Sequence, residues 1–476
     1  MCETRNVTIP AHDGPIDLSR PHFVGIGGSG MSAVAQLLLA SGSRVSGSDT
    51  SDTAALRALE DAGARVAVGH TASNLPADTT VLVWSSAVTV SNPELTAARR
   101  TGIPIVHRAD VLAHLIATAE QSVAVAGTHG KTMTTGILSA ALAHMDPSHV
   151  IGGTPVGRPN AHHGRGGLLV AEADESDRTV GRYHPQVAVV LNVDDDHPEQ
   201  YVDLDDALDT FERLARNSGV LVVSADDHGA RLLTERLQLA PGPRVVTVGE
   251  SRNADVRVMR VLWDGAASHV TVQDTDGSWH HFTLAVPGRH NAMNAAAAFA
   301  AGRALGAEPA DLVEGINAFQ GIQRRLTTTG SHAGVTVLDS YAHHPSEITA
   351  DLATARMLTE GRVIAVFEPT GWTRTAALGE EMGRRLAAAD EVVILNVHST
   401  VESPLTGVGT EPIAATVAEM GGRAHATTGG QEVEDLVAEP AGPGDLVVTM
   451  GAGTADRVGR AVLLRLAEAP APAPAP

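Results

Sequence analysis

The sequence predicts a three-domain α/β fold in which the N-terminal and C-terminal domains are Rossmann-like. The chain has 476 residues, enough for about three domains of roughly 150 residues each. Along it, short apolar runs typical of buried strands alternate with helical patterns, as in parallel βαβ units. This alternation starts anew near residues 22, 122 and 327, which sets the number of domains at three.

The first domain is predicted at residues 21–119, after an N-terminal tail at 1–20. Its opening apolar run leads into a glycine cluster and then into a helical stretch, the order expected at the start of a Rossmann-like unit. The predicted elements are strands at 22–26, around Val45, at 80–84 and at 103–107, a helix at 31–40 and a turn at 47–49.

The second domain is predicted at residues 120–326, the third at 327–468, and an Ala/Pro tail at 469–476. In the second, strands are predicted at 122–126, 168–171, 187–193 and 220–224, an added β region of edge hairpins at 255–286, and an Ala-rich helix at 291–304. In the third, strands are predicted at 335–338, 363–367, 391–395 and 446–450.

Composition excludes several classes of function. The formal net charge of −21 argues against non-specific nucleic-acid binding, which needs a basic surface. Apolar runs are far shorter than the ~20 residues of a membrane-spanning helix, and residues 1–20 carry no signal-peptide core. Cys2 is the single cysteine, so no disulfide can form within the chain. We expect a cytoplasmic protein, monomer or homodimer, without nucleic-acid or membrane partners.

The strongest motif is a phosphate-binding loop between a strand and a helix. Backbone N–H groups of such a loop and the N-terminus of the following helix bind phosphate. The lysine is expected to reach the β- and γ-phosphates of ATP, and the last hydroxyl to hold Mg²⁺. The full pattern has a glycine where this chain has Val125, so the motif is a variant. It predicts a central domain with a P-loop ATPase-type parallel sheet, and its residues are Gly127, Thr128, His129, Gly130, Lys131 and Thr132.

Lys131 is the only lysine among 34 basic residues, and arginine stands at all the other positions. A base-composition bias explains the general preference for arginine. Because the two cations differ in shape and hydration, the survival of this one lysine indicates that arginine cannot serve in the loop.

A second glycine-rich loop follows the first strand. It matches G-x-G-x-x-G with an acidic residue about 20 positions later, which taken alone predicts NAD or FAD binding; a turn that merely packs a helix on the sheet is the plainer interpretation. An NAD-dependent oxidoreductase leaves Lys131 unexplained, and a phosphotransferase leaves the third domain unexplained. Both loops together predict ATP use on a nucleotide-linked substrate. The loop residues are Gly25, Gly27, Gly28, Ser29 and Gly30, followed by Asp49.

Two acidic segments, 172–177 and 192–197, each follow a predicted strand. Carboxylates at the carboxyl ends of strands beside a P-loop are where Mg²⁺ is held, although solvated acidic loops are common in so acidic a protein. The adjacent His343 and His344 have no cysteine nearby, so we expect them to contact a substrate or a helix start rather than zinc. Asp339 ends a strand and is a candidate acceptor for a ribose hydroxyl.

The order of these motifs resembles the Mur ligase family over about residues 21–466. Two segments, Glu-Ala-Asp-Glu-Ser-Asp and Tyr-Ala-His-His-Pro, are similar to those of the members that add L-alanine to UDP-N-acetylmuramate. The motifs that carry the resemblance lie at 22–31, 127–132, 172–177, 192–197, 287–294, 324–325 and 341–345.

The resemblance implies an ATP- and Mg²⁺-dependent ligase that activates the carboxylate of UDP-N-acetylmuramate as an acyl phosphate and joins it to L-alanine. The first glycine loop is then implied to bind uridine diphosphate rather than NAD. Beyond the P-loop, implied ATP contacts are His290, Asn291, Asn294, Arg325 and Asp339, and implied Mg²⁺ ligands are Thr132, Glu172 and His197. Implied substrate contacts beyond the first loop and Asp49 are Glu175, Ser176, Asp177, Tyr341, His343 and Arg374. Catalysis is implied for Lys131, His343 and Arg374, with His343 as the general base.

The sequence departs from the family pattern in three places. The family's Phe-Gln-Pro-His segment is here Phe-Glu-Pro-Thr, with Arg374 kept; its Asp-Ile-Tyr turn is Asn396-Val397-His398; and Met133 stands where threonine is usual. The altered pocket is compatible with drift in an ordinary cell-wall ligase, with a paralogue that joins a different amino acid in a specialised pathway, or with weakened catalysis.

Overall fold

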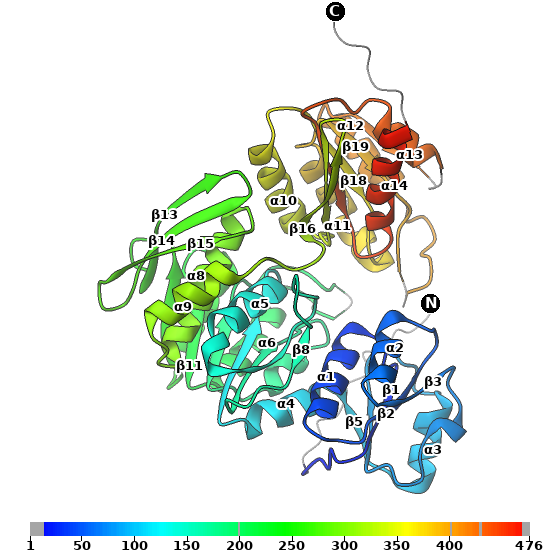
Figure 1. Ribbon diagram of the computed structural model, residues 1–476, viewed down its shortest axis with the longest axis vertical. Helices are drawn as coiled ribbons and strands as arrows, with labels where there is room; N and C mark the ends of the chain where they lie inside the picture. The colour runs from blue at the N-terminus through cyan, green and yellow to red at the C-terminus, as the bar shows by residue number, and fades with distance from the viewer. Residues whose placement is uncertain (1–13, 199, 400–401, 428–430, 469–476) are drawn as a thin grey trace, which may run out of the picture.

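The computed structural model describes residues 14–198, 200–399, 402–427 and 431–468 (Figure 1). Within them the chain forms three sheets that helices cover, so the predicted three-domain α/β fold is confirmed. In this part of the chain, no helix is both long and apolar enough to cross a membrane. The predicted tails at residues 1–20 and 469–476 fall largely or wholly outside the described residues.

The N-terminal sheet has five parallel strands in the order β3-β2-β1-β4-β5. The turn predicted at residues 47–49 is wrong, because these residues lie inside β2. Gly47 is needed for packing: a Cβ there would come within 2.7 Å of Ile26 Cδ1. The elements are β1 (Pro21–Val24), α1 (Ser29–Ala40), β2 (Ser46–Asp49), α2 (Ala54–Asp61), β3 (Arg65–Val68), β4 (Val81–Trp84), α3 (Pro93–Thr101), β5 (Ile105–His107) and α4 (Arg108–Thr118).

The central sheet has ten strands in the order β15-β14-β13-β12-β11-β10-β6-β9-β7-β8. Its middle is parallel, and the β region predicted at 255–286 is confirmed as an antiparallel addition, β13–β15, at one edge. The strands are β6 (Gln121–Ala126), β7 (Ser148–Val150), β8 (Ala161–His162), β9 (Leu168–Glu172), β10 (Val187–Val190), β11 (Val220–Ser224), β12 (Arg244–Gly249), β13 (Val256–Asp264), β14 (Ala267–Gln273) and β15 (Trp279–Leu284).

Five α-helices lie in the described part of the central domain. Alanine favours helix formation, and the run of alanines in α8 is almost entirely buried, where its small side chains allow close packing against α5. This packing fixes the start of α8 beside the loop that precedes α5. The helices are α5 (Lys131–Ala141), α6 (Leu204–Arg216), α7 (His228–Leu237), α8 (Arg289–Ala304) and α9 (Pro309–Ala318).

The C-terminal sheet has six strands in the order β16-β17-β21-β18-β19-β20, all parallel except the first pair. It begins at Arg325, two residues before the predicted start of this domain. Its elements are β16 (Arg325–His332), β17 (Val335–Ser340), α10 (Pro345–Leu358), β18 (Val363–Phe367), α11 (Trp372–Leu386), β19 (Glu391–Ile394), α12 (Glu411–Glu419), β20 (Ala424–Ala426), α13 (Gln431–Ala438), β21 (Leu446–Met450) and α14 (Ala455–Glu468).

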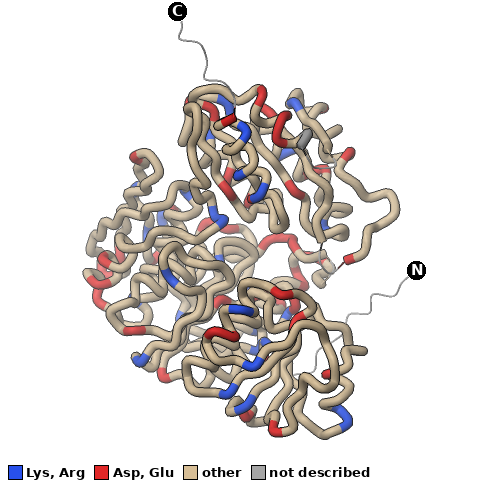
Figure 2. Tube along the Cα trace, turned by 45° about the vertical axis from the view of Figure 1, so that its right-hand side comes forward, with Lys and Arg blue, Asp and Glu red and all other residues tan. Residues whose placement is uncertain are grey.

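The central domain lies between the other two (Figure 1). Arginine, lysine and acidic positions are interspersed over all three domains in the view of Figure 2, without a continuous basic stripe.

Candidate active site

The P-loop joins β6 to α5 and depends on two glycines. Gly127 has φ 134° and Gly130 has φ 85°, both in the region that favours glycine. A Cβ on Gly130 would lie 2.8 Å from Asn294 Oδ1, so this glycine also lets α8 approach the loop. Since α5 begins at Lys131, the positive end of its dipole faces the space that phosphate is predicted to fill.

Lys131 is held in the loop by hydrogen bonds. Its Nζ donates to the Gly127 carbonyl at 2.8 Å, to the Thr128 carbonyl at 3.0 Å, and to Glu175 Oε1 at 2.9 Å. Burial alone would lower the pKa of Lys131, but the nearby charges of Glu175 and Asp174 raise it above its usual value. The side chain is therefore a fixed cation at the base of the loop.

Thr132 and Glu172, two of the three predicted Mg²⁺ ligands, are in direct contact. The Thr132 hydroxyl donates to Glu172 Oε1 at 2.8 Å. A hydroxyl and a carboxylate are oxygen ligands of the kind Mg²⁺ prefers, and Mg²⁺ at phosphate sites takes few protein ligands. His197 has φ 57°, rare for a residue with a side chain, and its Nε2 is 3.7 Å from Glu175 Oε1 and from Asp196 Oδ2. The structure thus brings two of the three together, while the His197 ring lies near the carboxylates of Glu175 and Asp196 and, through Nδ1, 3.5 Å from Arg374 Nη2.

A cavity of about 510 Å³ runs between the three domains and joins the two predicted loops. The first glycine loop and α4 contribute from the N-terminal domain, the P-loop and both acidic segments from the central domain, and the start of α10 from the C-terminal domain. All three predicted metal ligands and five of the twelve predicted substrate contacts line this one cleft. Its lining includes Ser29, Gly30, Arg108, Lys131, Thr132, Glu172, Ser176, His197, Arg325, Tyr341 and His343.

Asp49 contacts the first glycine loop instead of the cleft. Its Oδ2 accepts the Gly27 N–H at 2.8 Å, and a Cβ on Gly27 would come within 2.9 Å of that oxygen. Gly25 has φ 78°, so the loop needs glycine at both positions. The carboxylate therefore shapes the loop, and the direct substrate contact predicted for it stays a prediction.

Arg108, the first residue of α4, lies in the cleft without having been predicted there. Its Nη2 is 3.3 Å from Asp174 Oδ2 in the central domain. A Cβ on Gly30 would come within 2.0 Å of Arg108 Nη1, so the third glycine of the loop makes room for this guanidinium. A lone arginine at a helix start carries no recognisable motif, which is why sequence reasoning missed it.

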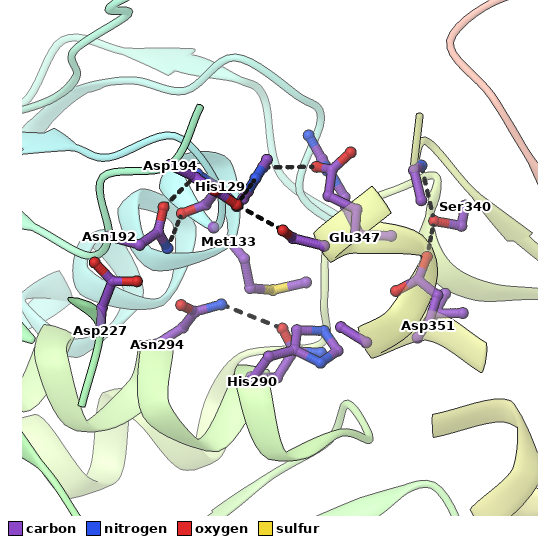
Figure 3. A pocket seen from close by; sticks show the side chains of 17 residues that line it. His129, Met133, Asn192, Asp194, Asp227, His290, Asn294, Ser340, Glu347 and Asp351 are labelled. Carbon is purple, nitrogen blue, oxygen red and sulfur yellow. Dashed lines mark hydrogen bonds and ion pairs between the residues drawn. The ribbon is translucent and has the colours of Figure 1, made fainter. Parts of the chain in front are cut away.

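A second cavity, of about 270 Å³, lies between the P-loop, α8 and α10 (Figure 3). It brings together most of the predicted ATP contacts. Burial lowers the pKa of His290 to about 4, so this imidazole is neutral at pH 7. The predicted residues that line it are His129, Gly130, His290, Asn291, Asn294 and Arg325.

Asp339 is not among the residues that line this cavity. Its Oδ1 accepts from the Thr449 hydroxyl at 2.9 Å and its Oδ2 from Arg324 Nε at 3.3 Å. Successive side chains of a strand point to opposite faces of the sheet, so the next residue, Ser340, faces the cavity together with Asp351 of α10. The carboxylate at this wall comes from a helix that the sequence did not single out.

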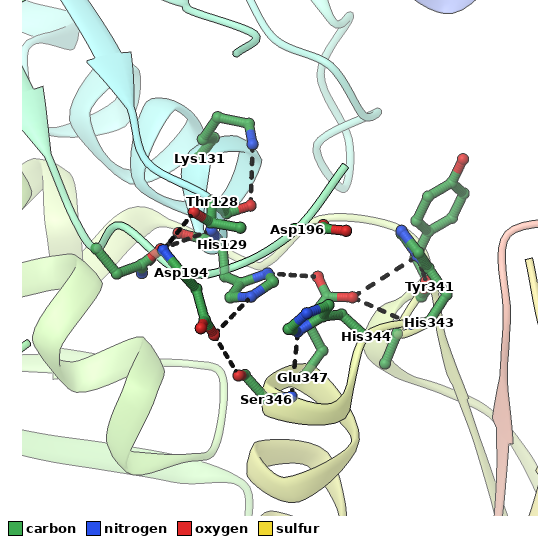
Figure 4. Close-up of polar contacts among 12 residues, drawn as sticks. Thr128, His129, Lys131, Asp194, Asp196, Tyr341, His343, His344, Ser346 and Glu347 are labelled. Carbon is green, nitrogen blue, oxygen red and sulfur yellow. Dashed lines mark hydrogen bonds and ion pairs between the residues drawn. The ribbon is translucent and has the colours of Figure 1, made fainter. Parts of the chain in front are cut away.

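The acidic segment at 194–197 ties the central domain to the C-terminal domain (Figure 4). The Ser346 hydroxyl donates to Asp194 Oδ2 at 2.6 Å. Arg374 Nε donates to Asp196 Oδ1 at 2.9 Å, and both side chains are at least nine-tenths buried. Arg374, predicted to face the substrate, is therefore paired across the domain interface.

Tyr341 and His343 line the cleft at the start of α10. The Tyr341 ring lies 5.2 Å from each of the guanidinium carbons of Arg324 and Arg325. His343 Nδ1 is 2.9 Å from the Tyr341 carbonyl; because a carbonyl only accepts, we assign the proton to Nδ1, and Nε2 is then the proton acceptor. Burial lowers the pKa of His343 to about 4, which keeps it neutral but makes it a weak base.

Two of the three departures from the family pattern lie together in the C-terminal domain, whereas Met133 lies in α5 and lines the 270 Å³ cavity. The Glu368 carboxylate accepts from the Thr454 N–H at 2.6 Å, the Thr454 hydroxyl at 2.9 Å and the Ala455 N–H at 3.2 Å, so it caps α14. Thr370 pairs with His398 in a short β-bridge. The described lining of the 510 Å³ cleft includes neither segment. Glu368 therefore has a structural role rather than a place in the cleft.

Two predicted substrate contacts beside the P-loop have internal partners. Glu175 accepts from Lys131, and Asp177 Oδ1 accepts the Thr179 N–H at 3.1 Å. Burial raises the pKa of both carboxyl groups above their usual values. Ser176, between them, does line the cleft.

Comparison with known proteins agrees with this architecture. Residues 20–120, 125–302 and 324–453 match three family models, described as "Mur ligase family, catalytic domain", "Mur ligase middle domain" and "Mur ligase, glutamate ligase domain". The UDP-N-acetylmuramate–L-alanine ligase of Streptomyces avermitilis is 46% identical over 461 residues, covering 95% of this chain and 99% of that protein. The ligase of the same name from Mycobacterium bovis is 41% identical, covering 95% and 96%.

Solved structures show the same arrangement of domains. A crystal structure of UDP-N-acetylmuramate-alanine ligase from Thermotoga maritima matches with a TM-score of 0.78 and 28% identity, covering 94% of this chain and 98% of that one. A murein peptide ligase from Psychrobacter arcticus, 23% identical with a TM-score of 0.70, shares the fold. Family membership removes the oxidoreductase interpretation of the first glycine loop. The chain belongs to the Mur ligase family.

Proposed function

We propose that the protein forms an amide bond between the carboxylate of UDP-N-acetylmuramate and L-alanine, using ATP, as the first amino-acid addition of peptidoglycan precursor synthesis. The observation that carries this proposal is the cleft that joins the first glycine loop to the P-loop. Near-full-length relatives named for this reaction support it. We propose the cytoplasm as the site of the reaction, and a monomer or homodimer as the working form.

We assign ATP binding to the smaller cavity and the sugar-nucleotide substrate to the larger cleft. His129, Arg325 and Glu347 line both, so the P-loop lies where the cavities meet. We place adenosine in the smaller cavity, against His290 and Asn294, and the phosphates along the P-loop toward Lys131. The γ-phosphate then lies at the edge of the larger cleft, where the sugar-nucleotide carboxylate would meet it.

Lys131 is proposed to offset the repulsion when a carboxylate attacks the γ-phosphate. Its fixed cation, together with the N-terminus of α5, would stabilise negative charge on the transferring phosphoryl group. Thr132 and Glu172 would hold Mg²⁺, which supplies further charge neutralisation for phosphoryl transfer. Arg108, at the first glycine loop, would pair with the diphosphate of the substrate.

The acyl phosphate must then meet a neutral amine. His343 Nε2 is the proposed acceptor for the proton of the amino acid's ammonium group, although its low pKa limits its strength as a base. The Arg374–Asp196 pair and the Ser346–Asp194 hydrogen bond keep the central and C-terminal domains in contact. This contact would exclude the water that hydrolyses an acyl phosphate.

An isotope-transfer experiment tests the acyl phosphate directly. UDP-N-acetylmuramate labelled with ¹⁸O in its carboxylate is turned over with ATP and L-alanine, and the released phosphate is analysed by mass spectrometry. One ¹⁸O atom in each phosphate is the expected result, because the carboxylate oxygen that attacks the γ-phosphate leaves with it. Unlabelled phosphate would contradict the mechanism, and a stable phosphorylated product would indicate a phosphotransferase.

A further inference from the structure

A buried carboxyl group forms part of the wall of the 270 Å³ cavity. Asp351, on α10, is 7% exposed and lines this cavity together with His290, Asn294 and Ser340 (Figure 3). Glu347, one helical turn earlier, lines it as well. Two carboxyl groups four residues apart on a helix face the same side and repel each other when both are charged.

The surroundings of Asp351 provide little to stabilise an ionised carboxylate. The Ser340 hydroxyl donates to its Oδ2, and the neighbouring wall includes the apolar side chains of Leu326, Ala342 and Ala350. Desolvation disfavours the charged form of a buried carboxyl group unless several hydrogen bonds compensate for it. The neutral acid, in contrast, presents an O–H donor to the cavity.

The charged groups around Asp351 act in both directions. Glu347, on the same helix, raises its pKa, and Arg325 of β16 lowers it, but Arg325 Nη1 is engaged by Glu347 Oε1 at 3.3 Å. His290 of α8 is neutral because burial lowers its pKa. Burial dominates, the Ser340 hydrogen bond opposes it, and the pKa of Asp351 is raised to about 7.

We propose that Asp351 is a nucleotide-contacting residue that works as a neutral carboxylic acid, donating its O–H hydrogen to an acceptor atom of the adenosine part of ATP. The inference rests on the proposed function in so far as this cavity holds the nucleotide. An ionised Asp351 would have no proton to donate and would add a negative charge near an anionic ligand. Nucleotide binding therefore takes up a proton wherever the empty site is ionised.

The expected pH dependence of ATP binding follows from the linkage between nucleotide binding and protonation of Asp351. With a pKa of about 7, half of the ligand-free molecules carry the proton at pH 7, so binding takes up about 0.5 proton per nucleotide. At pH 6 nearly all ligand-free molecules carry the proton on Asp351 and can bind the nucleotide, and at pH 8 roughly one in ten does. The apparent dissociation constant should therefore rise about tenfold between pH 6 and pH 8.

Isothermal titration calorimetry of the full-length protein with ATP and Mg²⁺ tests this at pH 6, 7 and 8. At each pH, two buffers of different ionisation enthalpy give the number of protons taken up. The Asp351→Asn variant keeps the shape and a hydrogen-bond donor but cannot titrate. Subtracting its proton count removes the contribution of the ATP phosphates themselves. The Ser340→Ala variant removes the hydrogen bond that lowers the pKa of Asp351.

In the wild type we expect the tenfold weakening and the uptake of about half a proton at pH 7. Whatever its affinity at pH 6, Asp351→Asn should lose the Asp351-dependent part of both effects, and Ser340→Ala should shift the weakening of ATP binding to higher pH. Equal affinity from pH 6 to pH 8, or a proton count that Asp351→Asn leaves unchanged, would overturn the inference. An absence of ATP binding at every pH would instead overturn the proposed function.

Discussion

Replacing Lys131 by methionine removes the counter-ion of Glu175, whose side chain is only 2% exposed. Breaking a buried ion pair by removing one partner costs about 3–5 kcal/mol, because the other charge stays buried without compensation. Burial already raises the pKa of Glu175, so this carboxyl group can take up a proton, which places the cost near the lower end. A loss of about 3 kcal/mol lowers the melting temperature of a domain of about 200 residues by about 6–12 °C.

A second change separates stability from catalysis. In the Lys131→Met/Glu175→Gln double variant the Glu175 charge is removed together with its counter-ion, so we expect most of the melting temperature to return. Turnover should stay at least about 10²-fold below wild type, the usual cost of one lost transition-state contact. Lys131→Arg is the matched control: it keeps a cation beside Glu175, but its planar fork does not replace an ammonium in a tight loop.

Circular dichroism melting and phosphate release from ATP are the two assays for these variants. Near-normal turnover in Lys131→Met or Lys131→Arg would refute the assignment of the loop to ATP. A double variant as unstable as Lys131→Met would refute the assumption that the buried Glu175 charge causes the loss of stability.

Three further predictions concern the rest of the site. Gly30→Ala places a methyl group against Arg108 Nη1. The KM for the UDP-linked substrate should therefore rise about tenfold, a cost of about 1.4 kcal/mol, while the KM for ATP stays unchanged. An unchanged KM for the UDP-linked substrate in steady-state kinetics would contradict this. Glu368→Gln removes the charged cap of α14 and should cost about 1 kcal/mol in urea unfolding without changing amino-acid preference, and a changed preference would place Glu368 in the acceptor site. Burial lowers the pKa of His290 and of His343 from 6.5 to about 4, so their contribution to stability should be full above pH 6.5 and fall as pH drops toward 4. The raised pKa of Asp351 acts in the opposite sense, so urea midpoints at pH 7.5 and pH 5 are compared in the Asp351→Asn variant, where equal midpoints would show that these imidazoles are not buried neutral.

Local patterns predicted the elements that carry a strong periodic or motif signal. The P-loop, the first glycine loop, the Ala-rich helix and the edge hairpins each have a signature within about 30 residues, because turns and amphipathic periods are local properties. Strand β3 was not predicted: it is short, lies at the edge of its sheet and is half-exposed, so its apolar signal is weak.

Residues whose orientation depends on tertiary packing were harder to predict. Asp339 and Ser340 are adjacent, and only the register of β17 decides which one faces the nucleotide cavity. Arg108 faces the cleft because the third glycine of a loop far from it in the sequence leaves space. The sequence indicated that Glu368 is an altered pocket residue, but in the structure it caps a helix that begins 87 positions later.

The predicted metal ligands likewise include two whose placement the sequence predicts and one whose placement it does not. Thr132 and Glu172 are brought together by two neighbouring parallel strands, β6 and β9, a relation that the sequence predicts from strand ends and a P-loop. The position of His197 depends on a left-handed backbone conformation, which no local pattern indicated. The roles of these residues toward Mg²⁺ stay predictions.

Phosphate release from ATP in the presence of Mg²⁺, UDP-N-acetylmuramate and a panel of amino acids tests the central claim most directly. We predict that release requires the sugar nucleotide and is fastest with L-alanine, with ADP and the amide as the other products. Release that peaks with a different amino acid would contradict the proposed acceptor, and no release with UDP-N-acetylmuramate and any amino acid would contradict the proposed reaction.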